Sequence, residues 1–97
     1  MIRSFSDKGT EDLFDGVESP AARKRCPSDL WSIAQRKLDQ VNRAADLRDL
    51  AVPPGNMLEK LKHDRKGQMS IRINQRYRIC FRWENGAAYE VEIVDYH

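Results

Sequence analysis

The sequence ends on three titratable residues, Asp95, Tyr96 and His97, and a series of arginines precedes them. Cleavage of RNA by its own 2′-hydroxyl needs a base for that hydroxyl, cations for the charge that develops on phosphorus, and an acid for the departing 5′-oxygen. Asp95 or His97 could accept the proton, and Tyr96 or a protonated His97 could donate one. Arg78 could bind phosphate oxygens with its planar guanidinium. These residue types are therefore suited to metal-independent cleavage of RNA.

Positive charge is concentrated between residues 60 and 82. This segment holds eight lysines and arginines against one acid, Asp64, whereas the rest of the chain holds nine bases and fourteen acids. Such a segment attracts phosphate backbones, although it is also typical of a surface that is merely solvated. We predict that its side chains contact RNA, namely Lys60, Arg65, Lys66, Arg72, Arg76 and Arg82.

The N-terminal part of the chain predicts one short strand followed by helices. Residues 2–5 are typical of a strand, and residues 7–16 are typical of a helix that ends at a glycine. Ser19-Pro20 indicates a second helix start, since serine is a common N-cap and proline suits the first turn.

The main helix is predicted at residues 28–46, after Pro27 interrupts the preceding pattern. Its apolar residues recur at steps of three and four and so form one core-facing stripe: Leu30, Ala34, Leu38, Val41 and Ala45. Two prolines then make residues 52–55 an extended linker.

From residue 69 onward the hydrophobic period changes to two, which predicts three antiparallel strands. A shift of one residue moves every side chain to the other face, so the register can be inferred. A two-residue Asn85-Gly86 loop would place Glu90 opposite Phe81, on the core. We therefore predict a three-residue loop with Arg82 opposite Glu90, which pairs Trp83 with Tyr89, Phe81 with Val91 and Ile79 with Ile93.

The same reasoning on the first hairpin sets two arginines opposite each other. A three-residue loop pairs Ile73 with Tyr77, Ile71 with Ile79 and Met69 with Phe81, and consequently Arg72 with Arg78. Two guanidiniums ~5 Å apart repel by roughly 3 kcal/mol at an effective dielectric constant near 20. Unless both side chains extend into water, this pairing predicts a binding surface for a polyanion. Arg76 falls opposite Tyr96, beside that surface.

Each candidate residue also has a purely structural interpretation. Asp95 could pair with a neighbouring arginine, Tyr96 could close the edge of the core, and a terminal histidine is often poorly ordered. His63 stands between Lys62 and Asp64 and is expected to be solvated. Cys80 shares the arginine face but lacks a neighbouring base, so it is a weak candidate nucleophile.

Length and composition restrict the class of protein. A chain of 97 residues, 40% hydrophobic and 33% charged, predicts a single folded domain over residues 1–97 whose active site is a shallow surface. We expect no membrane segment and no signal peptide. Cys26 and Cys80 have neither a CxxC partner nor nearby histidines, so we expect no disulfide, metal or cofactor, and a cytoplasmic location.

Three stretches of the chain resemble HigB-type toxins of the RelE superfamily. They are LEKLKHDRKGQMSIRIN at 58–74, YRICFRW at 77–83 and VEIVDYH at 91–97. The opening MIRSF and the segments 47–50 and 53–56 are also similar, so the resemblance covers nearly the whole chain. The closing Asp-Tyr-His is its most specific element.

The resemblance implies a fold, an activity and partners. The fold would be α+β, with N-terminal helices packed on one face of a small, mainly antiparallel sheet. The activity would be that of a type II toxin, a ribosome-dependent mRNA endoribonuclease that inhibits translation. A HigA-like helix-turn-helix antitoxin would bind the toxin and, with it, operator DNA. The catalytic set carries over onto Lys62, Arg78, Asp95, Tyr96 and His97.

Two positions depart from the family pattern. Some HigB toxins use a catalytic histidine where this chain has Glu59, which could still act as the base, and Met69 replaces a frequent aromatic residue. The assignment of base and acid stays open. Two other functions remain alternatives, a ParE-like toxin that targets DNA gyrase and a non-catalytic module that binds nucleic acid.

Overall fold

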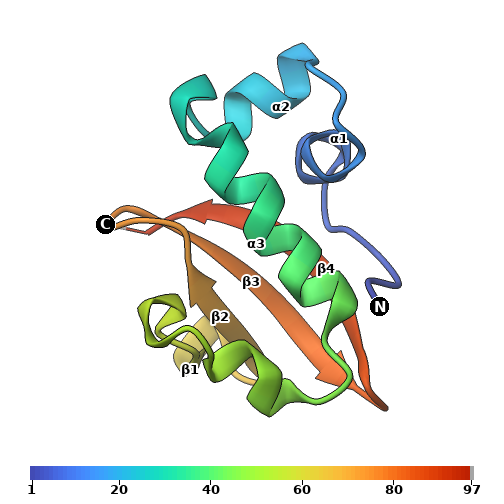
Figure 1. Ribbon diagram of the computed structural model, residues 1–97, viewed down its shortest axis with the longest axis vertical. Coiled ribbons are helices and arrows are strands. Elements are labelled where there is room, and N and C mark those ends of the chain that lie inside the picture. Colours follow the sequence, from blue (N-terminus) through green and yellow to red (C-terminus); the bar gives the residue numbers. More distant parts are fainter. Residues whose placement is uncertain (97) are drawn as a thin grey trace.

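Three helices are followed by an antiparallel sheet in the computed structural model, which describes residues 1–96. The helices are α1 (Lys8–Asp15), α2 (Pro20–Arg25) and α3 (Trp31–Arg43), and the strands are β1 (Glu59–Lys60), β2 (Gln68–Arg72), β3 (Tyr77–Glu84) and β4 (Ala87–Asp95). The strands lie in the order β1-β2-β3-β4, and α3 crosses one face of the sheet (Figure 1). The predicted α+β architecture is confirmed.

The caps of α1 and α2 lie where the sequence placed them. The Asp7 carboxylate accepts a hydrogen bond from the Thr10 N–H at 2.7 Å, and Gly16 ends α1 at φ 78°. The Ser19 hydroxyl accepts from the Ala22 N–H at 3.0 Å, with proline in the first turn of α2. Within residues 1–96, no helix is both long and apolar enough to cross a lipid bilayer.

The main helix is shorter than predicted. A 3-10 turn at Ser28–Leu30 precedes α3, and Ala44 takes an extended conformation that ends it. Ala34, Leu38 and Val41 are completely buried, as the stripe predicted. Ala45 is exposed because the helix has already ended, and Ala44 is buried in its place.

The core lies between α3 and one face of the sheet. The buried side chains on that sheet face alternate along the strands, as strand geometry requires. They are Ile71, Ile73, Tyr77, Ile79, Phe81, Val91 and Ile93. The opposite face of the sheet is therefore turned away from α3 and carries the alternate residues.

The first hairpin has the predicted register, and the second does not. Ile71 pairs with Ile79 and Arg72 with Arg78, as expected. In the second hairpin Glu84 pairs with Ala87, so the loop is the two-residue Asn85-Gly86 turn that the sequence argument rejected. The register changes between Cys80 and Arg82 through an irregularity at which Glu90 adopts φ 54°. This β-bulge adds one residue on β4, which keeps Glu90 off the core and restores the predicted pairing of Ile79 with Ile93.

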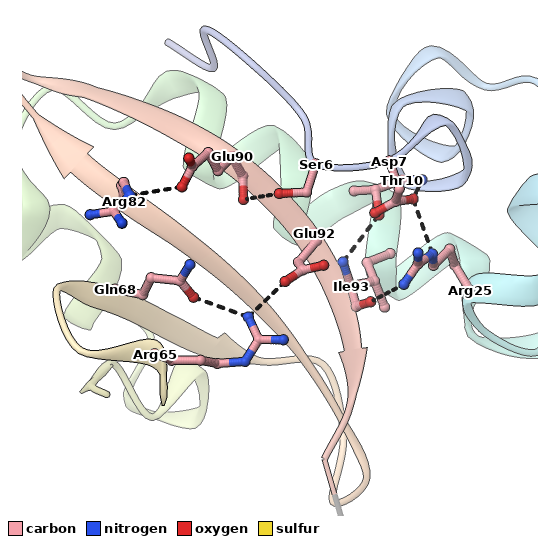
Figure 2. Close-up of polar contacts among 10 residues, drawn as sticks. All are labelled: Ser6, Asp7, Thr10, Arg25, Arg65, Gln68, Arg82, Glu90, Glu92 and Ile93. Carbon is pink, nitrogen blue, oxygen red and sulfur yellow. Dashed lines mark hydrogen bonds and ion pairs between the residues drawn. The ribbon is translucent and has the colours of Figure 1, made fainter. Parts of the chain in front are cut away.

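The first residues of the chain run beside the outer edge of β4. Residues 2–5 do not form a full strand, but Ile2 bridges Ala88 and Phe5 bridges Val91 in parallel orientation. The Ser6 N–H donates to the Val91 carbonyl at 3.0 Å, and the Ser6 hydroxyl donates to the Glu90 carbonyl at 2.9 Å (Figure 2). Backbone groups of β4 that a lone edge strand would expose are thus bonded.

Side chains from the helices continue this cover along β4. The Ile93 N–H donates to the Thr10 hydroxyl at 3.1 Å, and the Ile93 carbonyl accepts from Arg25 at 3.4 Å (Figure 2). Asp7 joins the two side chains, because it accepts from Thr10 at 3.0 Å and pairs with Arg25 at 3.1 Å. The outer edge of β4 is therefore bonded from Ala88 to Ile93.

Candidate active site

The sheet face turned away from α3 carries a row of polar side chains across all four strands. Glu59 of β1 pairs with Ser70 of β2, Ser70 pairs with Cys80 of β3, and Cys80 pairs with Glu92 of β4. The next row contains Arg72 and Arg78. Alternation places all of these side chains on one face, as the sequence predicted for the arginines.

Arg78 is the best positioned of the arginines. Its Nε donates to the Ser70 hydroxyl at 2.7 Å, and its Nη2 donates to the Met57 carbonyl at 2.7 Å. Ser70 belongs to β2 and is completely buried, so this acceptor is held rigidly within the sheet. Two fixed acceptors hold the guanidinium in one orientation while its remaining N–H groups can bind a ligand.

The loop that supplies the Met57 carbonyl is fixed to α3 through Asn56, which is completely buried. Its amide nitrogen donates to Gln40 of α3 at 3.1 Å and to the Leu50 carbonyl at 3.1 Å, and its amide oxygen accepts from Lys37 of α3. Met57 follows with φ 49° and presents its carbonyl to the sheet. The position of Arg78 thus depends on α3. No motif in the sequence indicates this dependence.

Replacing Asn56 with alanine should lower the free energy of unfolding by about 3 kcal/mol, because it removes the amide partner of the buried Lys37 ammonium and of three acceptor oxygens. Urea denaturation measures the change. The matched control is Gln75→Ala, which removes an exposed amide from the β2–β3 turn and should change the value by less than about 0.5 kcal/mol. Equal, small effects in both variants would contradict the anchoring role of Asn56.

The opposed arginines are separated by their acceptors. Arg72 pairs with Arg78 in the register, as predicted, but its Nε donates to the Asn74 carbonyl at 3.0 Å, toward the β2–β3 turn. Arg78 is directed instead toward Ser70 and Met57. Partial charges on carbonyl and hydroxyl oxygens therefore offset the repulsion, and neither guanidinium forms an ion pair within residues 1–96.

Asp95 forms a two-pronged ion pair with Arg76. The two carboxylate oxygens accept from Arg76 Nε at 2.8 Å and from Nη2 at 2.7 Å, and this bonding raises the pKa of the Arg76 guanidinium. Arg76 also lies over the Tyr77 ring, 5.5 Å from its centre. Asp95 thus pairs with a neighbouring arginine, as its purely structural interpretation proposed. Two donors of Arg76 are occupied by this carboxylate. The Tyr96 N–H donates to the Arg76 carbonyl at 2.6 Å, which confirms their predicted opposition.

Two further arginines are also paired. Arg65 extends from the His63–Arg65 3-10 turn and donates to Glu92 at 2.6 Å and to Gln68 at 3.0 Å (Figure 2). The bond to Glu92 raises the pKa of the Arg65 guanidinium, and Tyr96 lies close enough to add to this effect. Arg82, farther along β3, donates to Glu90 at 2.7 Å (Figure 2). Arg65 therefore connects the 3-10 turn to β4 through its bond to Glu92. The high content of basic residues in this segment did not reveal that structural role.

A surface hollow of about 400 Å³ lies beside Tyr96. It is lined by Glu59, Lys60, Leu61, Lys62, His63 and Tyr96. Four predicted site residues therefore meet around one depression, although Glu59 and Lys60 come from the edge strand and Tyr96 from the end of the chain. Tyr96 is 42% exposed, so it does not close the core. The carbonyl that anchors Arg78 belongs to Met57, two residues before Glu59.

The remaining predictions fall outside this hollow. Lys66 lines an adjoining depression, which also contains Lys60 and Lys62. Cys80 is completely buried, and burial raises the pKa of its thiol to about 11, so it is no thiolate nucleophile at neutral pH. His97 lies outside the described residues.

The hollow combines the groups that phosphodiester chemistry needs. A carboxylate and a phenol face one depression, two ammonium groups line it, and a fixed guanidinium stands on the same sheet face. Such an arrangement can bind a phosphate, accept a proton at one side and donate one at the other.

Comparison with known proteins gives the family. The profile of the family described as "RelE-like toxin of type II toxin-antitoxin system HigB" matches residues 3–97. This chain belongs to the HigB family of toxins. Toxin HigB-1 of Vibrio cholerae serotype O1 is 36% identical over 88 residues, which cover 91% of this chain and 90% of the relative. A Proteus vulgaris protein named endoribonuclease HigB is 33% identical over 104 aligned positions that cover 100% of both chains.

The fold of this HigB-family chain also occurs in a chain of a solved toxin-antitoxin complex. A chain in the crystal structure of the heterotetrameric YoeB–YefM toxin-antitoxin complex from Staphylococcus aureus superposes with a TM-score of 0.60. The match covers 100% of this chain and 98% of the other, at 14% sequence identity. At that identity the match supports the RelE/YoeB-like fold alone. Both the predicted fold class and the predicted family are confirmed.

Proposed function

We propose that this toxin is a ribosome-dependent mRNA endoribonuclease that inhibits translation. The observation that carries the proposal is the meeting of Glu59, Lys60, Lys62 and Tyr96 around one hollow, with Arg78 anchored on the same face. The name of the full-length Proteus vulgaris relative supports the same activity. The function therefore follows from a site of proton-transfer groups and phosphate-binding cations.

The reaction requires two proton transfers, one from the 2′-hydroxyl to a base and one from an acid to the departing 5′-oxygen. The base takes the proton of the 2′-hydroxyl, the 2′-oxygen bonds to phosphorus, and the bond from phosphorus to the 5′-oxygen breaks. Tyr96 gives its proton to that departing oxygen, which leaves as a 5′-hydroxyl, and the other fragment keeps a 2′,3′-cyclic phosphate. Arg78 and Lys62 stabilise the extra negative charge on the phosphoryl oxygens.

Glu59 is a better candidate for the base than Asp95. It lines the same hollow as Tyr96, so base and acid face one substrate site. Both oxygens of Asp95 accept from Arg76, and proton acceptance there would compete with that ion pair. In this assignment Asp95 holds the end of β4 in place, which keeps Tyr96 beside the hollow.

The surroundings of the toxin complete the proposal. The hollow is a surface depression, so a ribosome would have to hold the message in line for attack, with the toxin acting in the cytoplasm. An antitoxin partner is expected from the toxin family. We propose that it is HigA-like, carries a helix-turn-helix motif and takes the complex to operator DNA.

Incubation with translating ribosomes tests the activity. We expect cleaved message with 2′,3′-cyclic phosphate ends, and no cleavage of the same message without ribosomes. DNA supercoiling by gyrase should continue in the presence of the toxin. Intact message together with blocked supercoiling would contradict the proposal and favour a ParE-like toxin, whereas RNA binding without either effect would favour a non-catalytic module.

A further inference from the structure

A second hollow of about 400 Å³ lies next to the first, and Tyr96 does not line it. It is lined by Lys60, Leu61, Lys62, His63, Lys66 and Gly67. The two hollows share four of these residues, Lys60 to His63, so both lie against the same short segment of the chain. Glu59 and Tyr96, the two groups assigned to proton transfer, do not line the second hollow.

His63 stands at the junction of the two hollows in a left-handed backbone conformation, φ 57°. Its carbonyl accepts from the Lys66 N–H at 3.1 Å, which closes the 3-10 turn. The imidazole is exposed and has no polar partner within residues 1–96. Histidine thus occupies a backbone conformation in which glycine would be more favourable. Backbone strain of this kind often accompanies function.

The chemistry of the second hollow suits a nucleotide. Three ammonium groups surround it, and no acidic residue lines it within the described chain. Leu61 is buried, and Gly67 adds no side chain, so part of the surface is apolar. A planar imidazole beside an apolar surface can stack on a nucleobase while ammonium groups bind the flanking phosphates.

We propose that this hollow binds the base of a nucleotide next to the scissile phosphate, with His63 as the stacking partner. The inference rests on the proposed nuclease activity. Lys60 and Lys62 line both hollows, so a strand whose scissile phosphate lies beside Tyr96 would have these two ammonium groups next to its neighbouring nucleotide. His63 is then a positioning residue, whose contact with the neighbouring base aligns the reacting 2′-hydroxyl. His63 is exposed, as the sequence predicted, and the proposal gives that exposed ring a substrate contact.

The first test removes the imidazole ring of His63 and leaves the fold intact. His63→Gly should keep or raise the free energy of unfolding, since it relieves the left-handed strain, yet lower kcat/KM for ribosome-bound message by at least about fivefold. Asn85→Gly is the matched control, because Asn85 has φ 50° in a turn that contributes to neither hollow. Its kcat/KM should stay at the wild-type value. Equal cleavage by His63→Gly and Asn85→Gly would overturn the proposal.

Messages with an abasic nucleotide on either side of the scissile bond separate stacking from a general structural role. At one of the two positions the missing base should lower kcat/KM of the wild-type toxin by about fivefold or more. The same abasic message should bring no further loss to His63→Gly. An abasic penalty of equal size in both proteins would contradict stacking on His63.

A binding measurement decides the point even if no message is cleaved. The chain has two histidines, so comparison with His63→Asn assigns the imidazole NMR signals of His63. A short single-stranded RNA should shift these signals, and the corresponding abasic strand should not. Equal shifts with both strands, or none with either, would overturn base binding here. Failure of the nuclease would appear separately, as intact message with the wild-type toxin.

Discussion

Replacing Arg78 with alanine is expected to lower ribosome-dependent message cleavage by about 100- to 1,000-fold, the usual loss when one fixed donor to a developing charge is removed. The size of the effect follows from the two anchors of the guanidinium, the Ser70 hydroxyl and the Met57 carbonyl, each at 2.7 Å. These bonds fix the arginine before substrate arrives, so little reorganisation is needed in the transition state. Single-turnover cleavage of a programmed message measures the rate.

Arg82→Ala is the matched control for this prediction. Arg82 lies on the same strand and the same sheet face, but its Nε is already bonded to Glu90 at 2.7 Å. We expect its loss to change the rate by less than about threefold, because a guanidinium already paired with Glu90 would attract phosphate only as one of several surface charges. Arg78→Lys should recover only part of the rate, since an ammonium cannot satisfy both anchors and a phosphate in one plane. Similar losses in Arg78→Ala and Arg82→Ala would refute a special role for Arg78.

The second large effect is expected at Tyr96. Tyr96→Phe removes the phenolic proton and should slow cleavage by about 100-fold, within the range for loss of a general acid. The ring remains, so the hollow keeps its shape. Tyr96 is 42% exposed at the end of β4, and the free energy of unfolding should therefore stay within about 0.5 kcal/mol of the wild-type value.

Tyr89→Phe provides the comparison for Tyr96→Phe. Tyr89 lies on β4, the strand that Tyr96 follows, and is half-buried, but it lines neither hollow beside the proposed site. Its cleavage rate should be unchanged. A message whose leaving 5′-oxygen is replaced by sulfur needs less protonation, so it should restore most of the rate to Tyr96→Phe. Failure of this rescue, with a slow rate on both messages, would show that Tyr96 does not act as the acid.

The sheet could be predicted from the sequence largely because its two faces differ in polarity. Alternating apolar residues gave the first hairpin its register and placed Arg72 opposite Arg78. The second hairpin shows the limit of that argument. Polarity required that Glu90 avoid the core, but it could not distinguish a longer loop from a short turn with a bulge, because both move the acid outward. The difference depends on whether a non-glycine residue tolerates φ 54°, which no alternation pattern reveals.

The sequence indicated which residues could form the candidate site. It did not indicate which hydrogen bonds and ion pairs those residues make. The resemblance indicated Lys62, Arg78 and Tyr96, and the fold places Lys62 and Tyr96 around one hollow and Arg78 on the same sheet face. The resemblance included the segment 53–56 but gave Asn56 no role, because its bonds to α3 join segments far apart in the chain. Arg65, Arg76 and Arg82 looked like equivalent phosphate ligands, yet each is bonded to a different carboxylate. Pairing of charges across a sheet depends on register and rotamers, which composition does not contain.

The bonded outer edge of β4 limits how another protein can recognise this side of the toxin. A foreign strand that sought main-chain hydrogen bonds there would first have to displace the N-terminal residues, Thr10 and Arg25. A neutralising protein that approaches from this side must therefore read side chains and shape. The same contacts oppose edge-to-edge pairing of two copies of this chain along β4, which is the pairing that extends sheets into fibres.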